Sequence, residues 1–157
     1  MANDTLHVVN PFTEQEACAV PMARLEEVED VVRRARVCFA EWKETEIAER
    51  VALCERFMTA FEGMREKVAR ELSEQMGKPL QQSHNEVTGM LDRVAHMAGI
   101  AEETLADEWL SDKPGFKRYI RHEPRGVVLD IAAWNYPLLI AVNVVVPSVL
   151  AGNAVLI

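Results

Sequence analysis

Apolar residues recur at three- and four-residue steps along three stretches of the chain, a spacing that puts side chains on one face of an α-helix. The stretches cover residues 25–42, 47–72 and 87–105. The second stretch leads to Gly77, with Pro79 just beyond, and this order of residues is a helix stop signal. The pattern therefore predicts three helices, each with one apolar face that packs against the rest of the fold.

Two other parts of the chain have the pattern of β-structure. Residues 5–22 read as short extended segments around Asn10-Pro11, which predicts a β-hairpin. Residues 116–122 alternate between two sets of side chains after the turn Lys113-Pro114-Gly115, which predicts a strand. A strand at the edge of a sheet exposes unpaired backbone groups, so this segment is expected to seek a partner.

The end of the chain reads as strand, turn, helix and second strand. Gly126 opens an apolar run over residues 127–133, and its β-branched content predicts a strand buried on both faces of a parallel sheet. Pro137 suits the first position of a helix over residues 138–150, which stops at Ala151-Gly152-Asn153. Residues 154–157 begin the next strand. Two strands joined by a helix indicate an α/β fold.

Composition narrows the class of protein. The 157 residues are 49% hydrophobic and 27% charged, which is a normal globular balance. A net charge of -8 and a pI near 5.0 argue against a nucleic-acid partner, since phosphate binding needs clustered Lys and Arg. The apolar run over residues 131–150 is interrupted by a turn and by Pro147, so no membrane span is expected. The start of the chain lacks a secretory signal pattern, so a cytoplasmic location is expected.

The cysteines and histidines indicate neither a disulfide framework nor a metal site. Cys18, Cys38 and Cys54 are widely spaced and odd in number. Cys38 and Cys54 fall on the apolar faces of predicted helices and are expected to be small buried hydrophobes. No pair of histidines has metal-ligand spacing. Lys78 follows a helix end, where its positive charge is expected to cap that helix.

Several motifs, taken together and in this order, resemble the NAD(P)-dependent aldehyde dehydrogenase superfamily. The resemblance covers nearly the whole chain. The motifs are Asn10-Pro11-Phe12-Thr13, Gly77-Lys78-Pro79-Leu80, Pro124-Arg125-Gly126-Val127-Val128, Trp134-Asn135-Tyr136-Pro137, Pro147 and Ala151-Gly152-Asn153-Ala154-Val155.

The resemblance implies the fold class and its division. It implies an α/β protein in which a β-hairpin and a helical layer lead into the first strand, helix and strand of a Rossmann-like parallel sheet. Residues 1–123 would form the hairpin, the helices and an edge strand used for oligomerisation, so a homo-oligomer is implied for the complete enzyme. Residues 124–157 would begin the cofactor-binding domain. The cofactor-binding lysine, the acid/base glutamate and the nucleophilic cysteine of the family have no counterparts among these residues.

The resemblance also implies the chemistry. Family members oxidise an aldehyde with NAD or NADP through a cysteine thioester. The oxyanion that forms is stabilised by the side-chain amide that directly follows Trp, which here is Asn135. Ile131, Ala132, Ala133 and Trp134, together with Asn135, match the segment that lines the nicotinamide side of the cofactor site. Many members have proline in place of Ala133, a departure that weakens assignment to a branch of the family.

Two residues in this region have alternative interpretations. Asn135 is also the kind of residue that caps a helix, and the predicted helix begins near Pro137. Asp130 is a carboxylate inside an apolar strand, where an unpaired charge is costly. It is expected to face a strand edge, a helix end or solvent, and the family gives no support for a catalytic role.

Three hypotheses about function follow from these observations. The first is the amino-terminal portion of an aldehyde dehydrogenase that acts on a small aldehyde or semialdehyde, with this chain inactive when alone. The second is a noncatalytic truncated product that folds with a partner through the edge strand or the exposed helix faces. The third is an independent helical binding module, which requires residues 126–157 to be dispensable.

Overall fold

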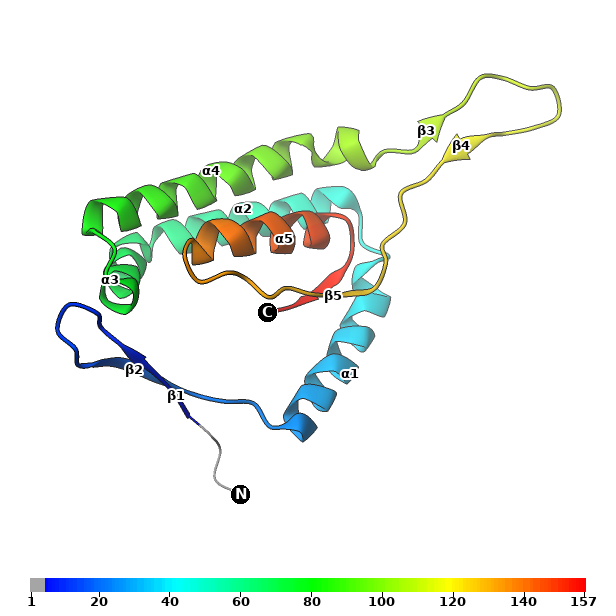
Figure 1. The fold of residues 1–157 in the computed structure, drawn as a ribbon. Coiled ribbons are helices and arrows are strands. Elements are labelled where there is room, and N and C mark those ends of the chain that lie inside the picture. Colours follow the sequence, from blue (N-terminus) through cyan, green and yellow to red (C-terminus); the bar gives the residue numbers. More distant parts are fainter. Residues whose placement is uncertain (1–4) are drawn as a thin grey trace.

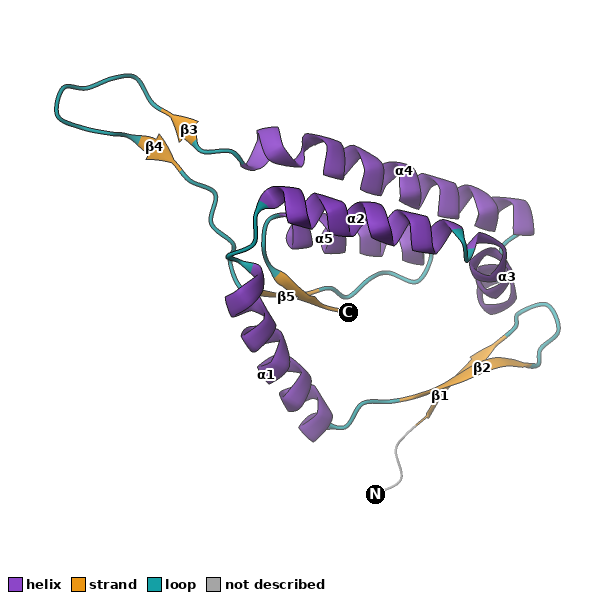
Figure 2. Cartoon of the chain, turned by 180° about the vertical axis from the view of Figure 1, so that it is seen from behind, coloured by secondary structure: helices purple, strands orange, loops and turns teal. Residues whose placement is uncertain are grey.

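Residues 5–157 are described in a computed structural model, which shows a helical body with two projecting hairpins (Figure 1). Strands β1 (Thr5–Val9) and β2 (Glu16–Pro21) pair antiparallel, with an irregularity in register between Val8 and Val9. The hairpin expected from the sequence is therefore confirmed. It lies beside α3 and is joined to the body through α1 (Figure 2).

The helical layer has four helices where the apolar pattern predicted three. They are α1 (Leu25–Trp42), α2 (Ile47–Glu62), α3 (Arg65–Met76) and α4 (Leu80–Leu105). The second predicted helix was wrong as one unit, because the chain bends at Gly63 and Met64 between α2 and α3. Glycine is a poor helix former, and the apolar spacing simply continues across the bend.

The predicted stop at Gly77 is confirmed. Gly77 has a φ of +68°, a left-handed conformation that favours glycine, and its N–H donates to the Ser73 carbonyl at 2.9 Å. A Cβ at this position would lie 2.7 Å from a ring carbon of Pro11, so the hairpin loop also depends on the missing side chain. Helix α4 begins soon afterwards, with Pro79 as its N-cap residue.

The core lies where α2, α4 and α5 (Pro137–Leu150) run side by side (Figure 1). Its apolar side chains come from all three helices, and their burial is the main favourable term for folding. The buried members are Cys54, Met90, Val94, Ala98, Ala101, Val142, Val146 and Leu150. Since α5 supplies three of them, the end of the chain is part of the core and not an appendage.

Strands β5 (Val127–Leu129) and β6 (Ala154–Leu156) flank α5 and pair parallel, with Val128 opposite Val155. The strand, helix and strand predicted for the end of the chain are thus present, but the first strand is shorter than predicted. Only residues 127–129 belong to it, because the ladder ends where β6 ends. Leu129 is 65% exposed, so in the described residues this strand is not buried on both faces.

The second hairpin projects from the body (Figure 1). Strands β3 (Glu108–Trp109) and β4 (Tyr119–Ile120) pair antiparallel, and the rings of Trp109 and Tyr119 lie 5.0 Å apart. The strand expected over residues 116–122 is therefore real but short. A bidentate ion pair from Arg121 to Asp107, at 2.9 and 3.1 Å, closes the base of the hairpin.

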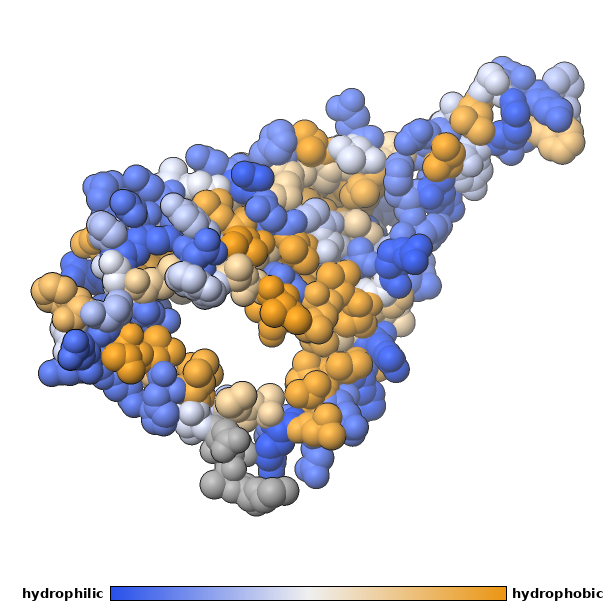
Figure 3. Space-filling view, in the orientation of Figure 1, coloured by the Kyte–Doolittle hydropathy of each residue, from blue (hydrophilic) through white to orange (hydrophobic). Residues whose placement is uncertain are grey.

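Apolar side chains gather around the opening between the first hairpin, α1 and the β5–β6 pair (Figure 3). Leu129 of β5 is exposed, as are Ile131 and Ile157, which follow β5 and β6 in the chain. A groove between α1 and β6 is lined by Cys38 of α1 together with residues of β6. The prediction that Cys38 is buried was wrong, because within residues 5–157 it lines this open groove. Within these residues, too, no helix is long and apolar enough to cross a bilayer.

Buried Arg50 of α2 joins the ends of α1 and α5. Its guanidinium donates to the carbonyls of Lys43 (2.9 Å) and Thr45 (2.7 Å) at the end of α1, and to that of Leu150 (3.1 Å) at the end of α5. Gly152, with a φ of +86°, leaves room for it, since a Cβ there would lie 2.8 Å from the nearest guanidinium nitrogen. Both the backbone and the space at residue 152 therefore require glycine.

Substituting Gly152 with alanine is expected to lower the free energy of unfolding by about 1–3 kcal/mol, because the left-handed backbone disfavours a side chain. The new Cβ would also displace Arg50, which adds to the loss. Urea denaturation of the purified protein measures this change. Gly99→Ala is the matched control, since nothing lies within 4 Å of the new Cβ in α4. That control should stabilise by about 0.5–1 kcal/mol. Equal effects of the two substitutions would contradict this role of Gly152.

The cysteines should differ in reactivity toward a thiol reagent at about pH 8. Cys54 is buried, and this burial, with a smaller contribution from Glu55, raises the pKa of its thiol, so less of the reactive thiolate is present. Cys38 is exposed and should react first, while Cys54 should react only when the protein is unfolded. Mass spectrometry of the labelled peptides gives the order, and early labelling of Cys54 would contradict the core described above.

Candidate functional site

The candidate site is the turn over residues 130–136, between the end of β5 and the start of α5. It lies at the carboxyl end of a parallel strand, which is where open α/β sheets commonly bind ligands. Ile131 and Trp134 are 86% and 83% exposed, and Ala133 and Asn135 are exposed as well. Ala132 is half-buried. The five residues singled out by sequence thus form one accessible segment.

Asn135 does not cap α5, so that alternative is contradicted. The N-cap residue of α5 is Tyr136, whose side chain makes no capping hydrogen bond, and Pro137 occupies the first turn as predicted. The N–H of Leu138 instead donates to a carboxylate oxygen of Glu86, at 3.0 Å. Asn135 contributes its backbone carbonyl to the contact with Lys78. Its exposed amide is therefore available to a ligand.

Lys78 and Glu86 form an ion pair beneath this turn. Their side chains are 9% and 0% exposed. The Lys78 ammonium also lies 3.9 Å from the centre of the Tyr136 ring and 3.4 Å from the Asn135 carbonyl oxygen. The expectation that Lys78 caps the preceding helix was wrong: its charge points across to α4 and α5.

Sequence reasoning missed Glu86. The pair is separated by eight residues with Pro79 between them, which is not a helical spacing, so no rule of local pairing could identify it. One feature of the sequence could have identified Glu86. Glu86 occupies the buried side of α4 with Ser83, Val87 and Met90, and an acidic residue on an apolar face needs a partner.

Asn153 fixes the position of β5. Its side-chain carbonyl accepts the N–H groups of Arg125 (2.6 Å) and Gly126 (3.0 Å), and its amide donates to the Ser148 carbonyl (3.2 Å). The start of β5 is thereby fastened to the end of α5. From the sequence, Asn153 was identified as part of the helix stop and of a family motif, but these hydrogen bonds were not predicted because the partners Arg125 and Gly126 are distant along the chain.

Asp130 directly follows β5, and its N–H donates to the Leu156 carbonyl at 2.8 Å. It is 7% exposed, which excludes the solvent-facing position considered for it. Within residues 5–157, its Oδ2 atom is buried and has no hydrogen-bond partner.

The arrangement can present a neutral N–H donor from a rigid backbone. Such a donor stabilises an oxyanion when it is held in place before the charge develops. The described residues bring no nucleophile to it: Cys18 lies in β2, Cys38 in α1, and Cys54 in the core. Within residues 5–157 there is also no group of three His, Cys, Asp or Glu side chains able to hold a metal ion.

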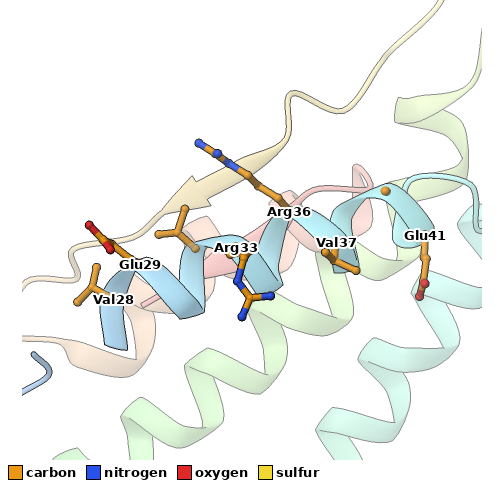
Figure 4. A pocket seen from close by; sticks show the side chains of 8 residues that line it. Val28, Glu29, Arg33, Arg36, Val37 and Glu41 are labelled. Carbon is orange, nitrogen blue, oxygen red and sulfur yellow. The ribbon is translucent and has the colours of Figure 1, made fainter. Parts of the chain in front are cut away.

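A separate groove runs along one flank of α1 (Figure 4). It is lined by Val28, Val37 and neighbouring residues of this single helix, with Arg33 and Arg36 at its sides. Because every lining residue comes from α1, no second element brings catalytic groups to it. The groove is distant in sequence from the turn over residues 130–136 and adds nothing to that site.

Residues 1–157 match the sequence pattern of the Aldehyde dehydrogenase family. N-succinylglutamate 5-semialdehyde dehydrogenase of Pseudomonas fluorescens (strain Pf0-1) is 31% identical over 150 residues, which are 94% of this chain and 30% of that protein. The protein of the same name from Chromohalobacter salexigens is 32% identical over 146 residues, which are 93% of this chain and 30% of the relative.

Solved structures agree with this match. A double mutant of betaine aldehyde dehydrogenase from Staphylococcus aureus, in complex with NAD+, superimposes with a TM-score of 0.89 at 26% identity. The superposition covers 97% of this chain and 31% of that one. This chain thus spans about 30% of the length of the relatives it matches. Since the family pattern covers every residue and the fold agrees, the chain belongs to the aldehyde dehydrogenase family.

Proposed function

We propose that this chain supplies the first part of the active site of an NAD(P)-dependent aldehyde dehydrogenase. The observation that carries the proposal is the exposed turn over residues 131–135, held at the carboxyl end of β5 in a chain of this family. In this proposal residues 1–123 form the helical layer and the oligomerisation hairpin. Residues 124–157 begin the cofactor-binding domain.

The residues of the turn fit a nicotinamide ring on physical grounds. Ile131 and Trp134 expose apolar side chains beside the end of a parallel strand, where a flat and partly apolar ring can pack. NAD or NADP, when bound, would accept the hydride that leaves the substrate carbon. We propose Ile131, Ala132, Ala133, Trp134 and Asn135 as the residues that line this side of the cofactor.

Asn135 is the proposed oxyanion donor. When a cysteine thiolate supplied from outside these residues adds to the aldehyde carbon, the carbonyl electron pair moves onto oxygen. The Asn135 amide donates a hydrogen bond to that oxygen without giving up a proton. The electron pair on oxygen re-forms the carbonyl as hydride leaves the same carbon. Water then hydrolyses the thioester to release the carboxylate. The proposed substrate is a small aldehyde or semialdehyde, in keeping with the names of the relatives.

We also propose that exposed surfaces of this chain contact the rest of the enzyme or a second subunit. Trp109 and Phe116 of the β3–β4 hairpin are 67% and 64% exposed, and the apolar face beside β6 is open. The same surfaces favour the second candidate, a noncatalytic product that folds with a partner chain. The place of α5 in the core speaks against an independent helical module.

The purified 157-residue chain should show no cofactor-dependent oxidation of aldehydes, because a thiol nucleophile is missing from the candidate site. The intact mass of the native protein from its source decides how the chain occurs. A mass near 17.7 kDa would favour the truncated product, and a much larger one the complete enzyme. Aldehyde turnover by pure material of this length would overturn the expectation.

In a complete enzyme, Asn135→Ala should lower kcat by roughly 10²–10³-fold, which is the usual cost of losing one oxyanion donor. KM should change little, because the hydrogen bond strengthens only as charge develops. Steady-state kinetics with a semialdehyde substrate measures both constants. Asn143→Ala provides the control, since Asn143 is an exposed asparagine of α5 whose side chain accepts from Arg93. A kcat equal to that of the control would remove Asn135 from the mechanism.

A further inference from the structure

The Lys78–Glu86 ion pair is the least exposed ion pair among the described residues. A buried ion pair contributes little net stability, because removing two charges from water costs about as much as their attraction returns. Its presence under an exposed turn therefore calls for another role. A buried pair can instead fix the relative position of the elements that carry it.

Glu86 joins α4 to the first turn of α5. One carboxylate oxygen accepts the Leu138 N–H at 3.0 Å, and the other faces the Lys78 ammonium. The N-terminus of a helix is electropositive and has N–H groups without partners, so a carboxylate there is favourable. Glu86 thus caps α5 from a neighbouring helix, in place of the missing cap from Tyr136.

Lys78 joins the same pair to the turn itself. Its ammonium lies 3.4 Å from the Asn135 carbonyl oxygen and 3.9 Å from the centre of the Tyr136 ring. Cation–π contact and hydrogen bonding both depend on position, so the ammonium restrains two consecutive residues of the turn. The backbone that follows the Asn135 side chain is then restrained from below, while the amide stays exposed.

We propose that Lys78 and Glu86 are positioning residues that aim the Asn135 amide at the developing oxyanion. The inference rests on the proposed function, because it acts through Asn135. A donor has to lie within a few tenths of an ångström of its working position to stabilise a transition state, and small displacements of catalytic groups are costly. The pair would hold that position while touching neither substrate nor cofactor.

The test is a double-substitution cycle in the complete enzyme. Lys78→Met with Glu86→Gln replaces the ion pair by two neutral side chains of similar size, and glutamine keeps an acceptor for the Leu138 N–H. This neutral pair should fold, since such replacements of buried ion pairs are commonly tolerated. Lys67→Met with Glu71→Gln is the matched control, because that pair is exposed on α3, with a separation of 3.7 Å.

The neutral pair should lower kcat roughly tenfold when Asn135 is present and less than twofold when Asn135 is already alanine. KM should stay within about twofold in both backgrounds, because substrate binding does not use the pair. The exposed control pair should leave kcat unchanged. An equal loss of kcat in both backgrounds, or no loss in either, would overturn the positioning role.

The two proposals fail in different ways. If Asn135→Ala alone leaves kcat unchanged, the oxyanion role fails and the positioning role falls with it. Suppose instead that Asn135→Ala lowers kcat, and that the neutral pair lowers kcat by the same factor with and without Asn135. Only the positioning role then fails. Should the neutral pair not fold, Glu86→Asp keeps the charge and withdraws the carboxylate from Leu138. It is then judged by the same cycle.

Discussion

The guanidinium of Arg50 joins the start of α2 to the ends of α1 and α5. The carbonyl groups at the end of a helix lack partners and carry partial negative charge, and Arg50 satisfies such groups at the ends of both α1 and α5. Desolvation lowers its pKa, but the ordinary pKa of arginine is high enough that the group remains charged. Its planar fork has five N–H donors in a fixed geometry, so it can serve several acceptors at once.

The geometry of the candidate site depends on this junction through a series of neighbouring contacts. Arg50 holds the end of α5, Gly152 lets the chain turn closely around the guanidinium, and Asn153 fastens the start of β5. At the other end of α5, Glu86 holds the first turn. Helix α5 is thus fixed at both ends by charged groups from other helices, and the exposed segment between β5 and α5 has fixed end points. A site can be open to solvent and still be rigid when its supports are buried.

Local patterns in the sequence predicted the elements that local forces determine. The stop at Gly77 and the start of α5 at Pro137 were identified because glycine and proline restrict the backbone wherever they occur. The bend between α2 and α3 was missed, since apolar spacing carries no information about the direction of the chain at Gly63.

Contacts between distant residues were beyond the reach of sequence patterns. The exposure of Cys38 depends on what covers the groove between α1 and β6, and the Lys78–Glu86 pair depends on how the loop between α3 and α4 meets α4. The role expected for Asn135 came from a family resemblance. Its exposure and the buried support beneath it could be seen only in three dimensions.

The same core has a consequence for how the protein is made. The α2–α4 face is completed only by Val142, Val146 and Leu150, and Trp42 donates to the Val149 carbonyl across 107 residues. Ribosomes add about 5–20 residues per second, so the apolar faces of α2 and α4 have to wait several seconds for α5 to be synthesised. During that interval the nascent chain presents the surface that chaperones recognise. Because α5 comes last along the chain, the apolar faces of α2 and α4 are exposed during synthesis, although they are covered in the finished fold.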